Sequence, residues 1–143
     1  MSDWVAHHVR GMALFKKGDI GAAAVLFSDA LGCRLPAAAA DYFRTSLALC
    51  RLRKKDYVHA LAALNEVTLP SMTLPANVIK VHVFGEAGRT EECIRTLRMV
   101  RGTAPQLTRE IAQEFHHRYV VRKPARRSDE WVTETEVRLL LAA

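Results

Sequence analysis

A repeated pattern of small and apolar residues limits the fold of this chain more than any other feature of its sequence. Residues 11–31 contain two apolar stretches separated by the turn Lys17-Gly18-Asp19. The pattern returns in residues 47–64, where Asp56 follows Asp19 by 37 positions, and more weakly in residues 78–97, where Cys93 follows Ala60 by 33 positions. Periods of this length suit one helical hairpin per repeat, so the pattern predicts a helical-repeat fold.

The composition agrees with an all-α domain. The chain has 143 residues, half of them apolar and a quarter charged, which is enough to bury a core and excludes a disordered chain. Only 7% of the residues are aromatic and Ala is abundant, a balance that favours tight helix packing over strand pairing.

Small residues recur where the helices of each hairpin must approach one another. Two helix axes come within about 8 to 10 Å only where side chains are small. These positions are Gly11, Ala23, Ala48, Ala60 and Cys93. Larger residues are expected to fill the space between hairpins, namely Phe27, Leu31, Leu61, Leu64, Leu97 and Val100.

The repeats resemble the tetratricopeptide repeat (TPR) family. The first repeat matches the family pattern at Gly11, Gly18, Asp19, Ala23, Phe27 and Ala30. The second matches at Ala48, Asp56, Tyr57 and Ala60, and the third at Gly88, Cys93 and Pro105. The resemblance implies a right-handed α-solenoid of three hairpins over residues 1–106, followed by one or two C-terminal helices.

Three further segments are expected after the repeats. Leu107, Ile111, Phe115 and Tyr119 recur every fourth residue, which predicts a capping helix over residues 107–121. Residues 122–127 read as a basic linker because Pro124 disfavours helix at the residue before it. Residues 128–143 read as a last helix with Ser128 as its N-cap.

Charge and cysteine content point to an intracellular protein of the cytoplasm or nucleus. The formal net charge of +6 gives a mild preference for acidic partners. Three cysteines without a close pair fit reduced thiols. The first residues carry no signal-peptide pattern, and we expect no membrane partner because no apolar run is long enough to span a bilayer.

No enzyme signature is present, so we expect a non-enzymatic protein without cofactor or metal. Phosphate-binding glycine loops, dinucleotide fingerprints and zinc-binding spacings are missing. The adjacent pairs His7-His8 and His116-His117 diverge by about 100° on a helix and cannot chelate one ion. His82 and Glu86 have a spacing that could share an ion, but two ligands alone make a weak case.

The TPR resemblance implies that a protein or peptide segment binds in a concave groove lined by the first helix of each hairpin. The implied lining residues are Val5, His8, Met12, Phe15, Lys16, Tyr42, Thr45, Leu49, Leu52, Arg53, Val78, His82 and Glu86. Members that bind chaperone tails hold a carboxylate with Lys and Asn, whereas His8, Met12 and Thr45 stand at those positions here. This difference argues against a chaperone-tail ligand.

A second candidate surface is a basic patch near the C-terminus that could contact an acidic ligand. It consists of Arg118, Arg122, Lys123, Arg126 and Arg127. Nucleic-acid binding is disfavoured because aromatic residues that stack on bases are missing apart from Tyr119.

The second and third repeats also resemble the N-terminal repeats of the TPR scaffold subunits of the anaphase-promoting complex, particularly its seventh subunit. The similarity rests on Ala48-x-Cys50, Ala60-x-Ala62-x-Leu64, Ala87-Gly88 and Pro105. It implies a scaffold or adaptor in a ubiquitin-ligase complex that forms a homodimer. Two alternatives stay open, a bacterial type III secretion chaperone of the TPR class and an RNA-binding helical-repeat protein.

Overall fold

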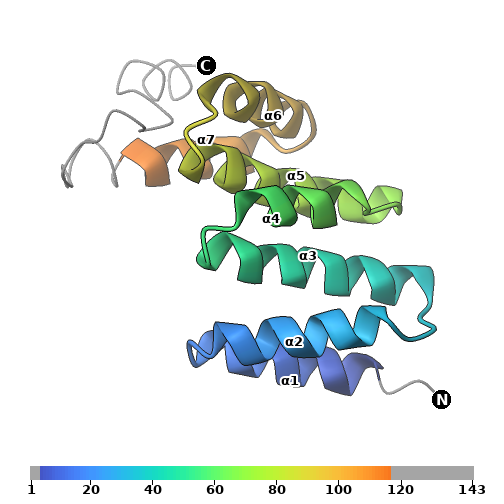
Figure 1. Cartoon of the computed structure of the whole chain (residues 1–143). Coiled ribbons are helices and arrows are strands. Elements are labelled where there is room, and N and C mark those ends of the chain that lie inside the picture. The colour runs from blue at the N-terminus through green and yellow to red at the C-terminus, as the bar shows by residue number, and fades with distance from the viewer. Residues whose placement is uncertain (1–3, 117–143) are drawn as a thin grey trace. The chain divides into compact units, whose positions relative to one another are not determined.

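The computed structural model describes residues 4–116, and these residues form seven α-helices and no strand (Figure 1). The all-α prediction is confirmed. The helices are α1 (Trp4–Lys16), α2 (Ile20–Leu31), α3 (Ala37–Arg53), α4 (Tyr57–Asn65), α5 (Pro70–Glu86), α6 (Thr90–Thr103) and α7 (Pro105–His116).

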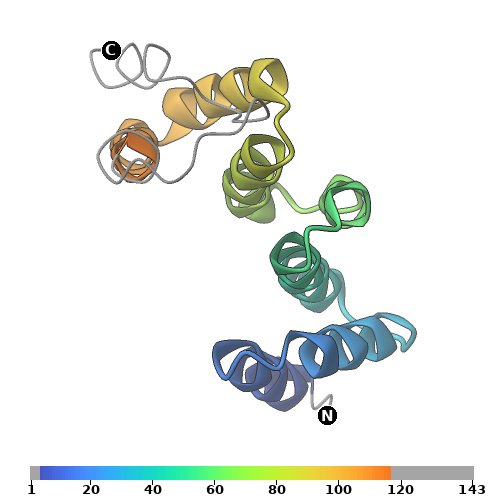
Figure 2. The ribbon, with the colours of Figure 1, turned by 60° about the vertical axis from the view of Figure 1, so that its left-hand side comes forward.

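The chain divides into two compact units, Met1–Ile79 and Lys80–Ala143, with the boundary inside α5. In the first unit each helix packs on the next, α1 on α2, α2 on α3 and α3 on α4, and α1 also contacts α3. Figure 2, which looks nearly along the axes of α3 and α4, shows the same succession from another side. In the second unit α6 packs on α7.

The three expected turns share one backbone geometry. In each, a residue with left-handed backbone follows the first helix, and the next amide donates to a carbonyl five residues earlier, as in a Schellman motif. The left-handed residues are Gly18 (φ 89°), Lys55 (φ 61°) and Gly88 (φ 76°). The closing bonds are Asp19 N to Leu14 O (2.9 Å), Asp56 N to Arg51 O (2.8 Å) and Arg89 N to Phe84 O (2.9 Å). The offsets of 37 and 33 that the sequence indicates therefore hold for the backbone of the turns.

The small residues lie in the helix contacts, as predicted. Ala23, Ala48, Ala60 and Cys93 are completely buried. Gly11 is also buried, and a Cβ atom built on it would overlap the ring of Phe27 from α2. The absence of a side chain at Gly11 thus allows the Phe27 ring to lie against the α1 backbone.

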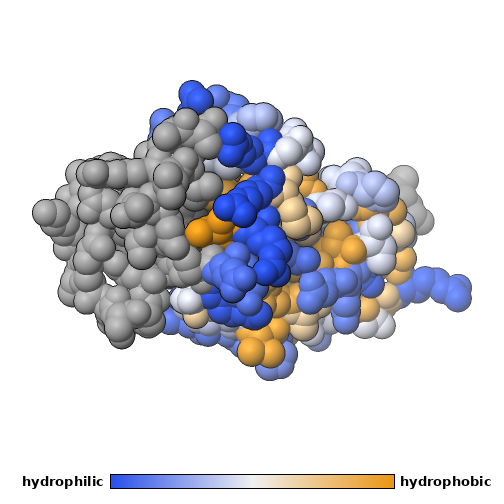
Figure 3. Space-filling model, turned by 90° about the horizontal axis from the view of Figure 1, so that it is seen from above, coloured by the Kyte–Doolittle hydropathy of each residue, from blue (hydrophilic) through white to orange (hydrophobic). Residues whose placement is uncertain are grey.

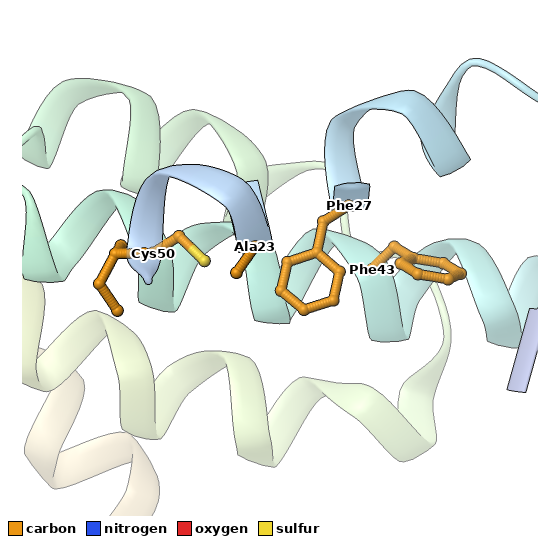
Figure 4. Packing of buried hydrophobic residues seen from close by; sticks show 5 residues of the cluster. Ala23, Phe27, Phe43 and Cys50 are labelled. Carbon is orange, nitrogen blue, oxygen red and sulfur yellow. The ribbon is translucent and has the colours of Figure 1, made fainter. Parts of the chain in front are cut away.

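The core of the first unit forms where α2 meets α3 (Figure 4). Ala23 and Phe27 come from α2, and Phe43 and Cys50 come from α3. The Phe27 and Phe43 rings are 5.9 Å apart between centroids. Leu31, expected to fill the space between hairpins, is only half-buried.

The second unit has its own buried residues. Leu97 and Val100 of α6 and Ile111 of α7 are nearly inaccessible to solvent. The thiol of Cys93 lies 3.5 Å from the carbonyl oxygen of Val81, within the reach of a weak hydrogen bond. Its small size and burial match the prediction for the third repeat.

The helix after the repeats begins earlier than predicted. Pro105 opens α7 at the first helical position, where a missing N–H costs nothing, so α7 starts two residues before the expected residue 107. Residues 117–121 of the expected capping helix, the basic linker 122–127 and the expected last helix 128–143 lie outside the described residues.

Six large apolar side chains are exposed among the described residues. They are Val5, Val9, Val25, Tyr42, Val58 and Met99. On the face drawn in Figure 3, hydrophobic and hydrophilic side chains are interspersed. In the first unit the exposed apolar residues lie on four helices that contact one another, with Val5 and Val9 on α1, Val25 on α2, Tyr42 on α3 and Val58 on α4.

Candidate functional site

The contact between α1 and α3 brings the first two parts of the expected groove together. Trp4 of α1 stacks on Tyr42 of α3, with ring centroids 6.0 Å apart and planes 21° apart. Tyr42 remains 44% exposed, and Val5 and Val9 on α1 are 54% and 63% exposed. Val9 was not among the residues expected in the groove. We call Val5, Val9 and Tyr42 the apolar face.

His8 lies inside the α1–α3 contact rather than on open surface. Its Nε2 atom is 2.7 Å from the hydroxyl oxygen of Ser46 on α3. Its ring centroid lies 5.7 Å from that of Phe27, 5.8 Å from Tyr42 and 5.5 Å from Phe43. Burial lowers the pKa of His8, because the charged imidazolium loses water that these neighbours replace only in part.

The other end of the α1–α3 contact is closed by a cation–π pair. The Arg53 guanidinium carbon lies 5.4 Å from the centroid of the Phe15 ring. Phe15 is half-buried, whereas Arg53 and its neighbour in the expected groove, Lys16, are exposed. Two cations of the expected groove, Lys16 and Arg53, therefore lie at the C-terminal ends of α1 and α3.

The remaining groove residues differ in their accessibility. Met12, Leu49 and Leu52 are half-buried. Thr45 is 7% exposed, and its hydroxyl donates to the carbonyl of Tyr42 at 2.9 Å, so it is turned away from ligands. Thr45 was expected to line the groove because the TPR resemblance assigns groove positions but does not show which side of α3 is buried in this chain.

The third part of the expected groove lies on α5. Val78 belongs to the first unit, and His82 and Glu86 belong to the second. All three are half-buried, and they follow one another by one helical turn. The candidate acidic-ligand patch of Arg118, Arg122, Lys123, Arg126 and Arg127 lies outside the described residues.

A buried carboxylate that the sequence analysis missed connects α3 to the start of α5. Asp41 is completely buried, and its oxygens accept hydrogen bonds from the backbone amides of Thr68 (3.2 Å) and Leu69 (2.8 Å). Arg44 donates to the same carboxylate at 3.0 Å and lies 3.8 Å from Glu66. The only available signal was one acidic residue in the otherwise uncharged start of α3.

A second missed feature is a pocket of about 520 Å³ between α1, α2 and the loop that follows α2. Its apolar lining includes Trp4, Leu26 and Leu35, and its polar lining includes Arg10 and the exposed thiol of Cys33. These residues are far apart in sequence, and no repeat position marks them.

Comparisons with family models, with curated proteins and with solved structures found no match for this chain. None of the described helices has the length and apolar character needed to cross a bilayer. Within residues 4–116, His, Cys, Asp and Glu side chains do not gather in a group of three that could hold a metal ion.

Proposed function

We propose that this chain is a non-enzymatic protein-interaction module of the TPR type, whose hairpins stack as a right-handed solenoid. The observation that carries the proposal is the repeated turn, in which Gly18, Lys55 and Gly88 share the same backbone at intervals of 37 and 33 residues. A small buried residue follows each turn at the same distance. Helical-repeat proteins use such units to build extended binding surfaces, and scaffold or adaptor proteins of larger assemblies are typical examples.

The proposed binding surface is the apolar face of α1 and α3 together with the cations at its end. Val5, Val9 and Tyr42 are all exposed on two helices that touch. A cluster of exposed apolar side chains with a polar rim is typical of protein-binding sites. An amphipathic helix or an extended segment with apolar anchors fits such a surface. Phe15, Leu49 and Leu52 of the same two helices are half-buried.

The test compares two carboxylates inserted on the apolar face with one carboxylate inserted at another exposed valine. The variant Val5→Asp with Val9→Asp places carboxylates on the apolar face, and Val58→Asp places one on α4, where the parent side chain is 77% exposed. Proteins retained from a lysate of the source organism are quantified by mass spectrometry for each variant. We expect the first variant to lose the specific partners because apolar anchors dominate interface energies, and we expect Val58→Asp to keep them.

Circular dichroism and melting curves must show that both variants fold like the parent. If the variant with two aspartates on α1 retains the same partners as the parent, the apolar face is not the binding surface. If neither the parent nor Val58→Asp retains a specific partner, the interaction-module proposal itself fails.

A further inference from the structure

The two turns of the first unit lie at the same end of their hairpins. Because α1 and α3 are each followed by an antiparallel helix, the α1–α2 and α3–α4 turns fall at one end and the α2–α3 loop at the other (Figure 1). The Arg53–Phe15 contact of 5.4 Å shows that the ends of α1 and α3 are neighbours. We call the cations at this end the basic edge, which consists of Lys16, Lys17, Arg53, Lys54 and Lys55.

The four lysines of the basic edge outnumber the carboxylates beside them in sequence, which are Asp19 in the first turn and Asp56 in the second. All four are exposed, and their ammonium groups make no ion pair with any described residue. The nearest carboxylate in sequence, Asp56, is engaged by His59 Nδ1 at 2.8 Å and by Arg51 at 3.9 Å. The hydrogen bond from His59 lowers the pKa of Asp56. The edge therefore has an excess of positive charge.

Lys55, one of the cations of the basic edge, has a strained backbone conformation. Its φ of 61° is in the left-handed region, which side chains other than glycine adopt only with strain. The same position of the other two turns is occupied by Gly18 and Gly88. Glycine would fit the second turn equally well, yet a lysine with an exposed side chain stands there. Strain of this kind is common where a side chain has a function.

We propose that the basic edge binds an acidic polypeptide segment. Packed helices are about 8 to 10 Å apart, and a segment in the polyproline II conformation advances about 9 Å in three residues, which is one full turn. Carboxylates three residues apart in such a segment lie on the same face and can therefore meet the α1–α2 turn and the α3–α4 turn together. This site lies on the turns; it shares Lys16 and Arg53 with the end of the surface proposed above, but it includes none of the three residues of the apolar face.

A polypeptide suits the edge better than a nucleic acid. Single-stranded nucleic acids bind through aromatic side chains that stack on bases as well as through cations. Two aromatic residues adjoin the edge in sequence: Phe15, whose ring is covered by the Arg53 guanidinium, and Tyr57, which is half-buried. Lysine ammonium groups act as point charges, which match carboxylates at any orientation.

The experiment uses the full chain and a defined probe. The probe is an acetylated peptide of about twelve residues with glutamate at every third position, and the matched peptide carries glutamine instead. Binding is measured by fluorescence anisotropy in low and high salt. We expect the glutamate peptide to bind in low salt, to lose affinity in high salt through screening, and to bind more tightly than the glutamine peptide.

Substitutions test whether the peptide binds to the basic edge or to another part of the chain. Lys17→Gln with Lys54→Gln and Lys55→Gln should weaken binding by about tenfold or more, at about two- to fivefold for each lysine. Arg34→Gln removes one exposed charge at the opposite end of the hairpins and should leave the affinity unchanged.

Lys55→Gly gives a readout that a purely structural role would not produce. The variant relieves the strain at φ 61° and should melt at a higher temperature than the parent, yet it should bind the glutamate peptide about two- to fivefold more weakly. The proposal is overturned if the glutamate peptide does not bind, or if the triple variant binds it as the parent does. It is also overturned if an oligothymidylate of equal charge or a phosphatidylserine vesicle binds the edge more tightly than the peptide.

Discussion

The carboxylate of Asp41 accepts a 2.8 Å hydrogen bond from the backbone amide of Leu69, across 28 positions of sequence. Leu69 directly precedes Pro70, the first residue of α5, so a side chain of α3 caps the start of a helix that belongs to the next hairpin. A carboxylate at this place accepts hydrogen bonds from the amides of Thr68 and Leu69, just before the helix, and interacts favourably with the positive end of the helix dipole.

Removal of this carboxylate should destabilise the fold strongly. Asp41→Ala leaves the backbone amides of Thr68 and Leu69 without their acceptor and Arg44 without its closest partner, and we expect a loss of about 3 to 5 kcal/mol in the free energy of unfolding. Urea denaturation followed by circular dichroism measures it. Asp29→Ala, a change at an exposed position of α2, is the control and should cost far less. Equal losses for the two variants would show that Asp41 does not fix the start of α5.

A methyl group at Gly11 should break the close contact with Phe27. Gly11→Ala forces the Phe27 ring or α1 to move, and overpacking of this kind costs about 1 to 3 kcal/mol. Gly21→Ala on α2 is the matched control because its Cβ would meet no atom within 4 Å. In that position alanine should stabilise the helix by about 0.5 to 1 kcal/mol. Thermal melting of both variants decides the outcome, and a stabilised Gly11→Ala would contradict the packing described.

The burial of His8 should make stability depend on pH. Its pKa in the folded state is lowered from the unfolded value of about 6.5, so the unfolded chain binds the proton more readily. The contribution of neutral His8 is therefore complete above about pH 6.5 and is lost as the pH falls through the folded pKa.

The variant His8→Gln isolates this contribution. Glutamine can still bond to the Ser46 hydroxyl but does not titrate. The unfolding free energies of the parent and the variant are measured in urea at about pH 7.5 and pH 5.5. The value for the parent minus the value for the variant should be smaller at the lower pH. A difference that is the same at both values would show that His8 does not titrate differently in the folded state.

The three thiols should react at very different rates. Cys33 is exposed, whereas Cys50 and Cys93 are completely buried, and burial raises the pKa of Cys50 so that its reactive thiolate is rarer. With a chromogenic disulfide reagent we expect one thiol to react rapidly in the native protein and the other two only after denaturation. Peptide mapping after alkylation identifies the fast thiol, and early modification of Cys50 or Cys93 would contradict the buried contacts assigned to them.

The hairpins could be predicted from the sequence because the interactions that define them are local. A left-handed residue at position 18 or 88, a small residue five positions later and the apolar spacing around both are visible within about twenty residues. Lys55 at the equivalent place of the second turn was located by its offset of 37, although lysine gives no local sign of left-handed backbone.

The candidate site could be predicted only in part, because its surfaces depend on which helix faces meet. The TPR resemblance put His8 and Thr45 into the groove, whereas the structure buries Thr45 and places His8 in the α1–α3 contact against three aromatic rings. Val9 was missed for the same reason, since nothing in the spacing shows that its side of α1 stays open.

The sequence by itself determined the helical hairpins, their turns and the small residues within them, since each depends on neighbours along the chain. The tertiary structure decided the Asp41–Leu69 bond and the Arg53–Phe15 contact, because each joins residues of different hairpins or helices. Such contacts form only when two helices adopt one relative rotation, and the sequence pattern of one helix leaves that rotation open.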